Sequence, residues 1–92
     1  MTVRWTPTAL RDLESLHAFI EHDRARAAAG IMDKMLAAIE NLARFPEMGR
    51  AGRAAGTREL VVSPYIVVYR IKKGAVELVA ILHGARRWPD SF

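Results

Sequence analysis

The sequence predicts an α+β domain in which a short N-terminal strand and an antiparallel helical hairpin pack on a small antiparallel β-sheet. Apolar residues recur at helical spacing over residues 7–45, and β-branched and aromatic residues dominate from Glu59 onward. The chain has 92 residues, which is enough for one compact core and too few for two. We therefore expect one domain covering residues 1–92.

The first helix is predicted to begin at Thr6 and Pro7, directly after a β-like start over residues 3–5. Threonine suits the N-cap position, and proline suits the first helical position because its missing N–H would have no partner there. The predicted buried face contains Leu10, Leu13, Leu16, Ile20 and His17. The helix is therefore amphipathic.

A second helix is predicted from Asp23, which can cap it, to Phe45-Pro46, which ends it. Its apolar stripe contains Ile31, Met35, Leu36, Ile39 and Leu42. The short link between the two helices indicates an antiparallel hairpin. Residues 46–57 follow with three glycines, two arginines and no apolar periodicity, which indicates a mobile basic loop.

Three strands are predicted at residues 60–62, 65–71 and 76–82. Ser63-Pro64 interrupts the first pair, because proline cannot donate a hydrogen bond to a strand ladder, and residues 72–74 (KKG) form a hairpin turn. This order predicts an antiparallel meander.

The last two strands are apolar on both faces. Simple alternation places Val76, Leu78, Ala80 and Leu82 on one side and Glu77, Val79, Ile81 and His83 on the other. Two helices cover only one face of a small sheet. We therefore expect the remaining apolar surface to bind a partner, since exposed apolar patches mark protein interfaces.

Charge is unevenly distributed along the chain. Residues 1–43 carry five basic and six acidic side chains, whereas residues 44–92 carry nine basic and four acidic ones. A basic half favours phosphate backbones or an acidic protein partner, and the alternative is a solvated cationic surface.

Composition excludes several classes of protein. The absence of cysteine removes disulfides and thiolate metal sites and fits a reducing compartment. The chain has no apolar region behind a basic start, and no segment approaches the roughly 18 apolar residues of a membrane span. We therefore expect a cytoplasmic protein without membrane contact.

Several runs together resemble the RelE/ParE superfamily of type II toxin–antitoxin systems. They are residues 57–62 (TRELVV), 65–70 (YIVVYR) and 81–89 (ILHGARRWP), preceded by 5–13 (WTPTALRDL) and 45–50 (FPEMGR). The order and spacing of these runs are more specific than any one of them, and they cover nearly the whole chain. The resemblance implies the same α+β fold and a growth-inhibiting toxin that is neutralised by a cognate antitoxin. It also implies that operator DNA is bound only through the antitoxin.

Two mechanisms share this fold. ParE-like members inhibit DNA gyrase without known nuclease chemistry, whereas RelE-like members cleave mRNA on the ribosome. The segment ending in residues 82–89 resembles ParE-like members more, so gyrase inhibition is our leading hypothesis. A third hypothesis is a non-toxic module that only binds the antitoxin.

The candidate site residues depend on the mechanism. RNA cleavage needs an acid or base and cationic donors at the phosphate, and the candidates are His83, Arg58 and Arg86. The alternatives are a half-buried structural histidine at His83 and a surface ion pair of Arg58 with Glu59. The predicted residues for binding a target or partner are Arg50, Arg53, Arg58, Tyr65, Tyr69, Val79, Ile81, Arg86, Arg87 and Trp88.

No cofactor or metal is expected. His17 and His22 are five residues apart, or about 140° around a helix, and so do not form a metal-binding pair. The glycines at 49, 52 and 56 follow a helix and precede no Lys-Ser or Lys-Thr, which argues against a P-loop.

Overall fold

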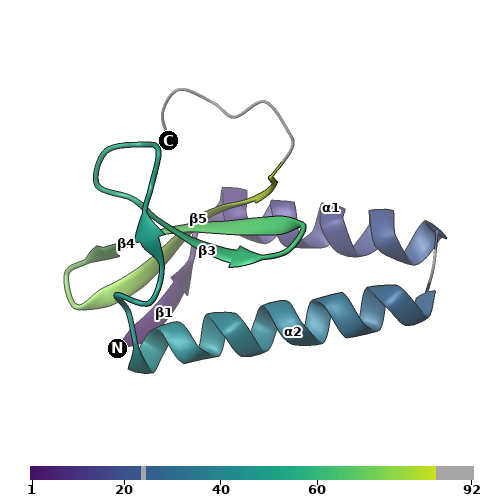
Figure 1. Cartoon of the computed structure of the whole chain (residues 1–92), viewed down its shortest axis with the longest axis horizontal. Coiled ribbons are helices and arrows are strands. Elements are labelled where there is room, and N and C mark those ends of the chain that lie inside the picture. Colours follow the sequence, from purple (N-terminus) through teal and green to yellow (C-terminus); the bar gives the residue numbers. More distant parts are fainter. Residues whose placement is uncertain (24, 85–92) are drawn as a thin grey trace.

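A computed structural model describes residues 1–23 and 25–84 of the chain, without the side chains of residues 20–29. In chain order the elements are β1 (Thr2–Trp5), α1 (Pro7–Asp23), α2 (Ala25–Arg44), β2 (Arg50–Ala51), β3 (Arg58–Val62), β4 (Tyr65–Lys72) and β5 (Ala75–His83). The two helices run side by side along one face of a sheet ordered β1-β5-β4-β3-β2 (Figure 1). The predicted α+β class is confirmed.

The sheet is mixed, which the sequence did not predict. The strands β2 to β5 pair antiparallel, but β1 pairs in parallel with β5, placing Thr2 opposite Ala75 and Trp5 opposite Leu78. Both helices separate β1 from the next strand along the chain. No tight turn therefore constrains the direction of β1, as a hairpin would.

The helix start is confirmed at α1. The Thr6 hydroxyl oxygen accepts a hydrogen bond from the N–H of Ala9 at 3.1 Å, as an N-cap does, and the same hydroxyl lies 2.7 Å from the carbonyl oxygen of Leu78. The predicted buried face is wrong in part, because Leu10 is 46% exposed and His17 is also exposed.

The predicted residues Leu13 and Leu16 do pack toward the core, together with Ala9, and Asp12 is half-buried among them. The side chain of Ile20 lies outside the described part of the structure. Asp12 contacts the backbone of β5, and this contact together with Thr6 sets the rotation of the helix about its axis. The rotation moves Leu10 out of the core.

The core lies between the helices and the sheet. Met35, Ile39 and Leu42 of α2 are buried against the strands, as predicted, whereas Leu36 is 39% exposed. Burying each of the three removes apolar surface worth about 1.5–3 kcal/mol. These contacts hold α2 on the sheet.

A β-bulge at Val79 overturns the predicted face assignment of β5. Val68 pairs with Ala80 and Tyr69 with Leu78, so Val79 is the extra residue. Leu78 and Ile81 consequently both face the helices, whereas Ala80 lies on the opposite face. Alternation counted without the bulge puts these side chains on the wrong sides.

The open apolar face expected on the last two strands is absent from the described structure. On the face opposite the helices, Val68, Val79 and Ala80 are buried within the chain itself, at 0%, 7% and 1% exposure. Ile81, on the helical face, is 6% exposed. Val79 and Ile81 are therefore core residues and do not form a ready partner surface.

Candidate functional site

The hydroxyl of Tyr69 organises the segment that follows α2. It donates a hydrogen bond to the carbonyl oxygen of Pro46 at 2.7 Å and accepts one from the N–H of Gly49 at 2.9 Å. The side chain is fully buried, and this burial raises the pKa of the Tyr69 phenol above its ordinary value. Tyr69 therefore supports the fold, and its side chain is not exposed to a partner in this structure.

Arg58 binds the same segment from β3. Its guanidinium donates to the carbonyl oxygen of Gly49 at 2.7 Å and to that of Glu47 at 3.3 Å. The suggested ion pair with Glu59 does not form, because adjacent residues of a strand point to opposite faces. The cation of Arg58 satisfies carbonyl groups of its own chain.

Glu59 fixes the basic loop. Its side chain is 2% exposed, and its carboxylate accepts hydrogen bonds from the Arg50 side chain at 3.1 Å and from the Arg53 backbone N–H at 2.8 Å. The irregular loop predicted for residues 46–57 is wrong at Arg50–Ala51, which forms β2 against β3. The side chains of Arg50 and Arg53 remain more than half exposed, where a partner can reach them.

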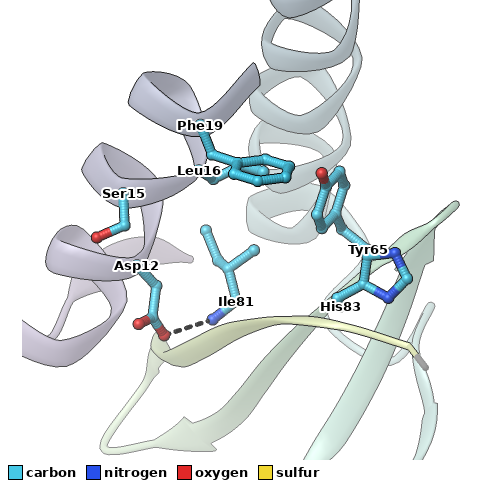
Figure 2. Close-up of a pocket in the computed structure, with 7 residues that line it drawn as sticks. All are labelled: Asp12, Ser15, Leu16, Phe19, Tyr65, Ile81 and His83. Atoms are coloured by element: carbon cyan, nitrogen blue, oxygen red, sulfur yellow. Dashed lines mark hydrogen bonds between the residues drawn. The ribbon is translucent and has the colours of Figure 1, made fainter. Parts of the chain in front are cut away.

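A cavity of about 390 Å³ lies between α1 and the ends of β4 and β5. Figure 2 shows its lining: Asp12, Ser15, Leu16 and Phe19 from α1, Tyr65 from β4, and Ile81 and His83 from β5. Phe19 is 66% exposed at its rim. The cavity offers an apolar wall, with the polar groups gathered at its margins.

Two aromatic rings form the sheet side of this cavity. Tyr65 and His83 are neighbours in the β4–β5 ladder, and their rings meet edge to face with centroids 5.5 Å apart. The predicted residues Tyr65 and His83 are thus brought together. Sequence reasoning missed Asp12, Ser15 and Phe19. The detectable signal was Asp12, which is polar but lies three and four residues from Ala9 and Leu16 on the buried side of the helix.

The nuclease candidates His83 and Arg58 are not brought together. His83 pairs with Tyr65 and Arg58 pairs with Tyr69, so four positions of β4 separate the two rows, or about 13 Å at roughly 3.3 Å per residue. The distance grows further because β4 lies between β3 and β5. The remaining candidates Arg86, Arg87 and Trp88 lie outside the described residues.

Within residues 1–23 and 25–84, no group of three His, Asp or Glu side chains is arranged to hold a metal ion. Neither described helix is long and apolar enough to cross a membrane.

Two helices packed on one face of a mixed sheet define a small α+β domain. The structure is similar to a chain of the chromosomal ParDE toxin–antitoxin system of P. aeruginosa, with a TM-score of 0.79, 19% identity, and coverage of 90% of this chain and 95% of that one. The family model described as "ParE toxin of type II toxin-antitoxin system, parDE" matches residues 3–88. The chain therefore belongs to the ParE toxin family, within the RelE/ParE superfamily.

Two relatives agree with this assignment. The protein Y4kP of Sinorhizobium fredii is 43% identical over 90 residues, covering 96% of this chain and 93% of Y4kP. The toxin RelE2 of Caulobacter vibrioides is 36% identical over 84 residues, covering 91% of this chain and 96% of RelE2.

Proposed function

We propose that this toxin arrests growth by ParE-like, non-enzymatic inhibition of DNA gyrase and that a cognate antitoxin neutralises it. The observation that supports the proposal is the separation of Arg58 from His83. Cleavage of RNA by its 2′-hydroxyl needs a cation and an acid or base at one phosphate. Here the Arg58 guanidinium instead binds the carbonyl oxygens of Glu47 and Gly49.

The cavity beside α1 is the proposed antitoxin site. It combines an apolar wall with the rim residue Phe19, which is suited to an apolar anchor side chain of a protein partner. Contact with operator DNA is then made by the antitoxin and not by the cavity.

The second candidate function is ribosome-dependent cleavage of mRNA. One observation favours it: His83 opens into a cavity that also contains Ser15 and Tyr65, which supply further proton donors. Under this alternative His83 is the acid or base.

Expression of the toxin without antitoxin tests the three hypotheses. Gyrase inhibition predicts growth arrest with relaxed plasmid or DNA breaks, and mRNA cleavage predicts cuts in phase with codons when transcript ends are mapped. Normal growth with soluble protein would indicate a non-toxic antitoxin-binding module.

A His83→Ala variant separates the two toxic mechanisms. We expect it to keep full growth arrest, because no proton transfer is needed for a protein contact. His17→Ala, the same substitution at an exposed position of α1 outside the cavity lining, serves as the matched control. Loss of arrest in His83→Ala alone, with the protein still folded, would reject the gyrase proposal in favour of the nuclease.

A further inference from the structure

The face of the sheet opposite the helices carries two arginine–carboxylate clusters. In β5, Glu77 lies between Val76 and Leu78, whose side chains pack on the helices, so the Glu77 side chain points the other way. Its carboxylate contacts Arg70 Nε at 2.6 Å and an Arg4 terminal nitrogen at 3.9 Å.

The second cluster is arranged in the same way around Glu59, which alternation also places opposite the helices. The Glu59 carboxylate contacts an Arg50 terminal nitrogen at 3.1 Å and Arg53 Nε at 3.9 Å. Glu59 pairs with Val68, two residues before Arg70 on β4. The two clusters therefore occupy consecutive rows of one face, about 6.6 Å apart along the strands and, because β4 lies between β3 and β5, about 10 Å apart across them. We call Arg4, Arg50, Arg53 and Arg70 together the arginine face.

In both clusters the carboxylate lies beneath its arginines. The Glu59 and Glu77 side chains are 2% and 16% exposed, whereas the four arginine side chains are between 37% and 57% exposed. The charge presented outward is therefore positive, while the less exposed carboxylates orient the guanidinium groups. A guanidinium has five N–H donors, so a contact through one or two of them does not exhaust its capacity. Planar donors held in place suit phosphate oxygens.

We propose that the arginine face binds the sugar-phosphate backbone of duplex DNA. Charge complementarity selects a polyanion, and the aromatic residues within the described part of the chain favour a duplex. Recognition of single-stranded RNA relies on bases stacked on exposed aromatic rings. Among the described residues of this face there is none, because Trp5, Tyr65 and Tyr69 all point toward the helices. Backbone recognition of a duplex needs only the cations.

This inference rests on the proposed function, because gyrase acts on duplex DNA and a toxin bound to it has that duplex within reach. It adds a second contact: the toxin binds gyrase itself and also binds the duplex DNA that gyrase holds. The cavity beside α1 lies on the other side of the sheet and stays available to the antitoxin.

Salt-dependent binding tests the proposal. The purified full chain is titrated into a labelled 20-base-pair duplex of arbitrary sequence and into a single-stranded RNA of the same length, using fluorescence anisotropy. Four phosphates neutralised by four arginines predict that the Kd for the duplex rises about 150-fold between 50 and 200 mM salt. Single-stranded RNA is expected to bind more weakly.

The decisive variant is Arg4→Gln combined with Arg70→Gln. Loss of two phosphate contacts is expected to weaken duplex binding and to reduce the rise in Kd over the same salt range to about 12-fold. Arg11→Gln with Lys34→Gln is the matched control, because it removes the same charge from exposed positions of the two helices. Should the double variant fail to fold, Arg4→Gln alone is tested. We expect it to lower the slope of log Kd against log salt concentration by about one.

Equal weakening by the double variant and its control would overturn the proposal, since diffuse charge would then explain the binding. Absence of duplex binding, or tighter binding of the RNA, would overturn it as well. A gyrase supercoiling assay is run in parallel. Inhibition without duplex binding rejects only the arginine face, whereas duplex binding without inhibition supports that face and rejects the proposed function.

Discussion

The carboxylate of Asp12 accepts a hydrogen bond from the backbone N–H of Ile81 at 3.0 Å, and this contact joins α1 to β5. The strand β1 covers the edge of β5 only as far as Leu78, opposite Trp5. Beyond that point a side chain from the helix takes the place of the missing strand. Asp12 therefore both positions the helix and satisfies a backbone donor that β1 does not reach.

Replacing Asp12 with alanine is expected to destabilise the fold by about 1–3 kcal/mol, because a partly buried N–H loses its acceptor. Asp12→Asn should cost less, since an amide oxygen still accepts the bond. Urea unfolding of the free chain measures both. Ser15→Ala, one turn further along α1, is the control, and an equal loss in that variant would show that the Ile81 contact is not responsible.

Features that depend on a residue's own backbone preferences were predicted from the sequence. Features that depend on how the strands pair with one another were missed. Thr6 and Pro7 mark the start of α1 by their own backbone preferences. The bulge at Val79 has no local signature, because it exists only in the register between β4 and β5, and one extra residue reverses every later side chain. The role of Asp12 depends on the same register.

The basic loop illustrates the same limit. Residues 46–57 have no apolar periodicity. Their fixed conformation comes from hydrogen bonds to Tyr69, which is distant in sequence, and to Glu59 on the neighbouring strand β3. Of the candidate site, Tyr65 and His83 were named from the sequence, because Tyr65 begins one predicted strand and His83 directly follows another. Phe19 was not found, because an exposed aromatic residue on a helix has no distinguishing pattern.

Tyr69→Phe tests how the loop is held. Removing the hydroxyl leaves the buried N–H of Gly49 without its acceptor and frees the carbonyl of Pro46. We expect a loss of about 1–3 kcal/mol at neutral pH. Amide hydrogen exchange should show faster exchange at Gly49, with Tyr65→Phe as the matched control.

The same variant should change the alkaline limit of stability. Burial raises the pKa of Tyr69, so the folded state favours the neutral phenol. Its contribution is complete below the ordinary tyrosine value of 10.0 and is lost as pH rises through that value toward the raised one. Tyr69→Phe should therefore lose less stability than the wild type above pH 10, and parallel curves for the two proteins would contradict this assignment.

Glu77 should contribute to the acid limit. The hydrogen bond from Arg70 is the main cause that lowers the pKa of its carboxyl below the ordinary value of 4.5. A lowered pKa gives stability that is present above 4.5 and is lost as pH falls through the folded value. Glu77→Gln is expected to be less stable than the wild type at pH 7 and to have a flatter profile between pH 5 and pH 3. Glu40→Gln, on the exposed side of α2, should leave the profile unchanged.

Gly49→Ala tests whether the loop packs as closely on the sheet as the contacts indicate. A Cβ at Gly49 would lie 2.6 Å from the Tyr69 hydroxyl oxygen and 2.9 Å from the carbonyl oxygen of Glu59, both closer than real Cβ contacts. Either the loop or the tyrosine must move, at an expected cost of about 1–3 kcal/mol. Gly30→Ala is the matched control within α2, where an added Cβ meets nothing within 4 Å and should stabilise the helix by about 1 kcal/mol. Thermal unfolding should therefore show a lower Tm for Gly49→Ala and a higher Tm for Gly30→Ala. An unchanged Tm in Gly49→Ala would mean that the loop does not pack closely between Tyr69 and Glu59.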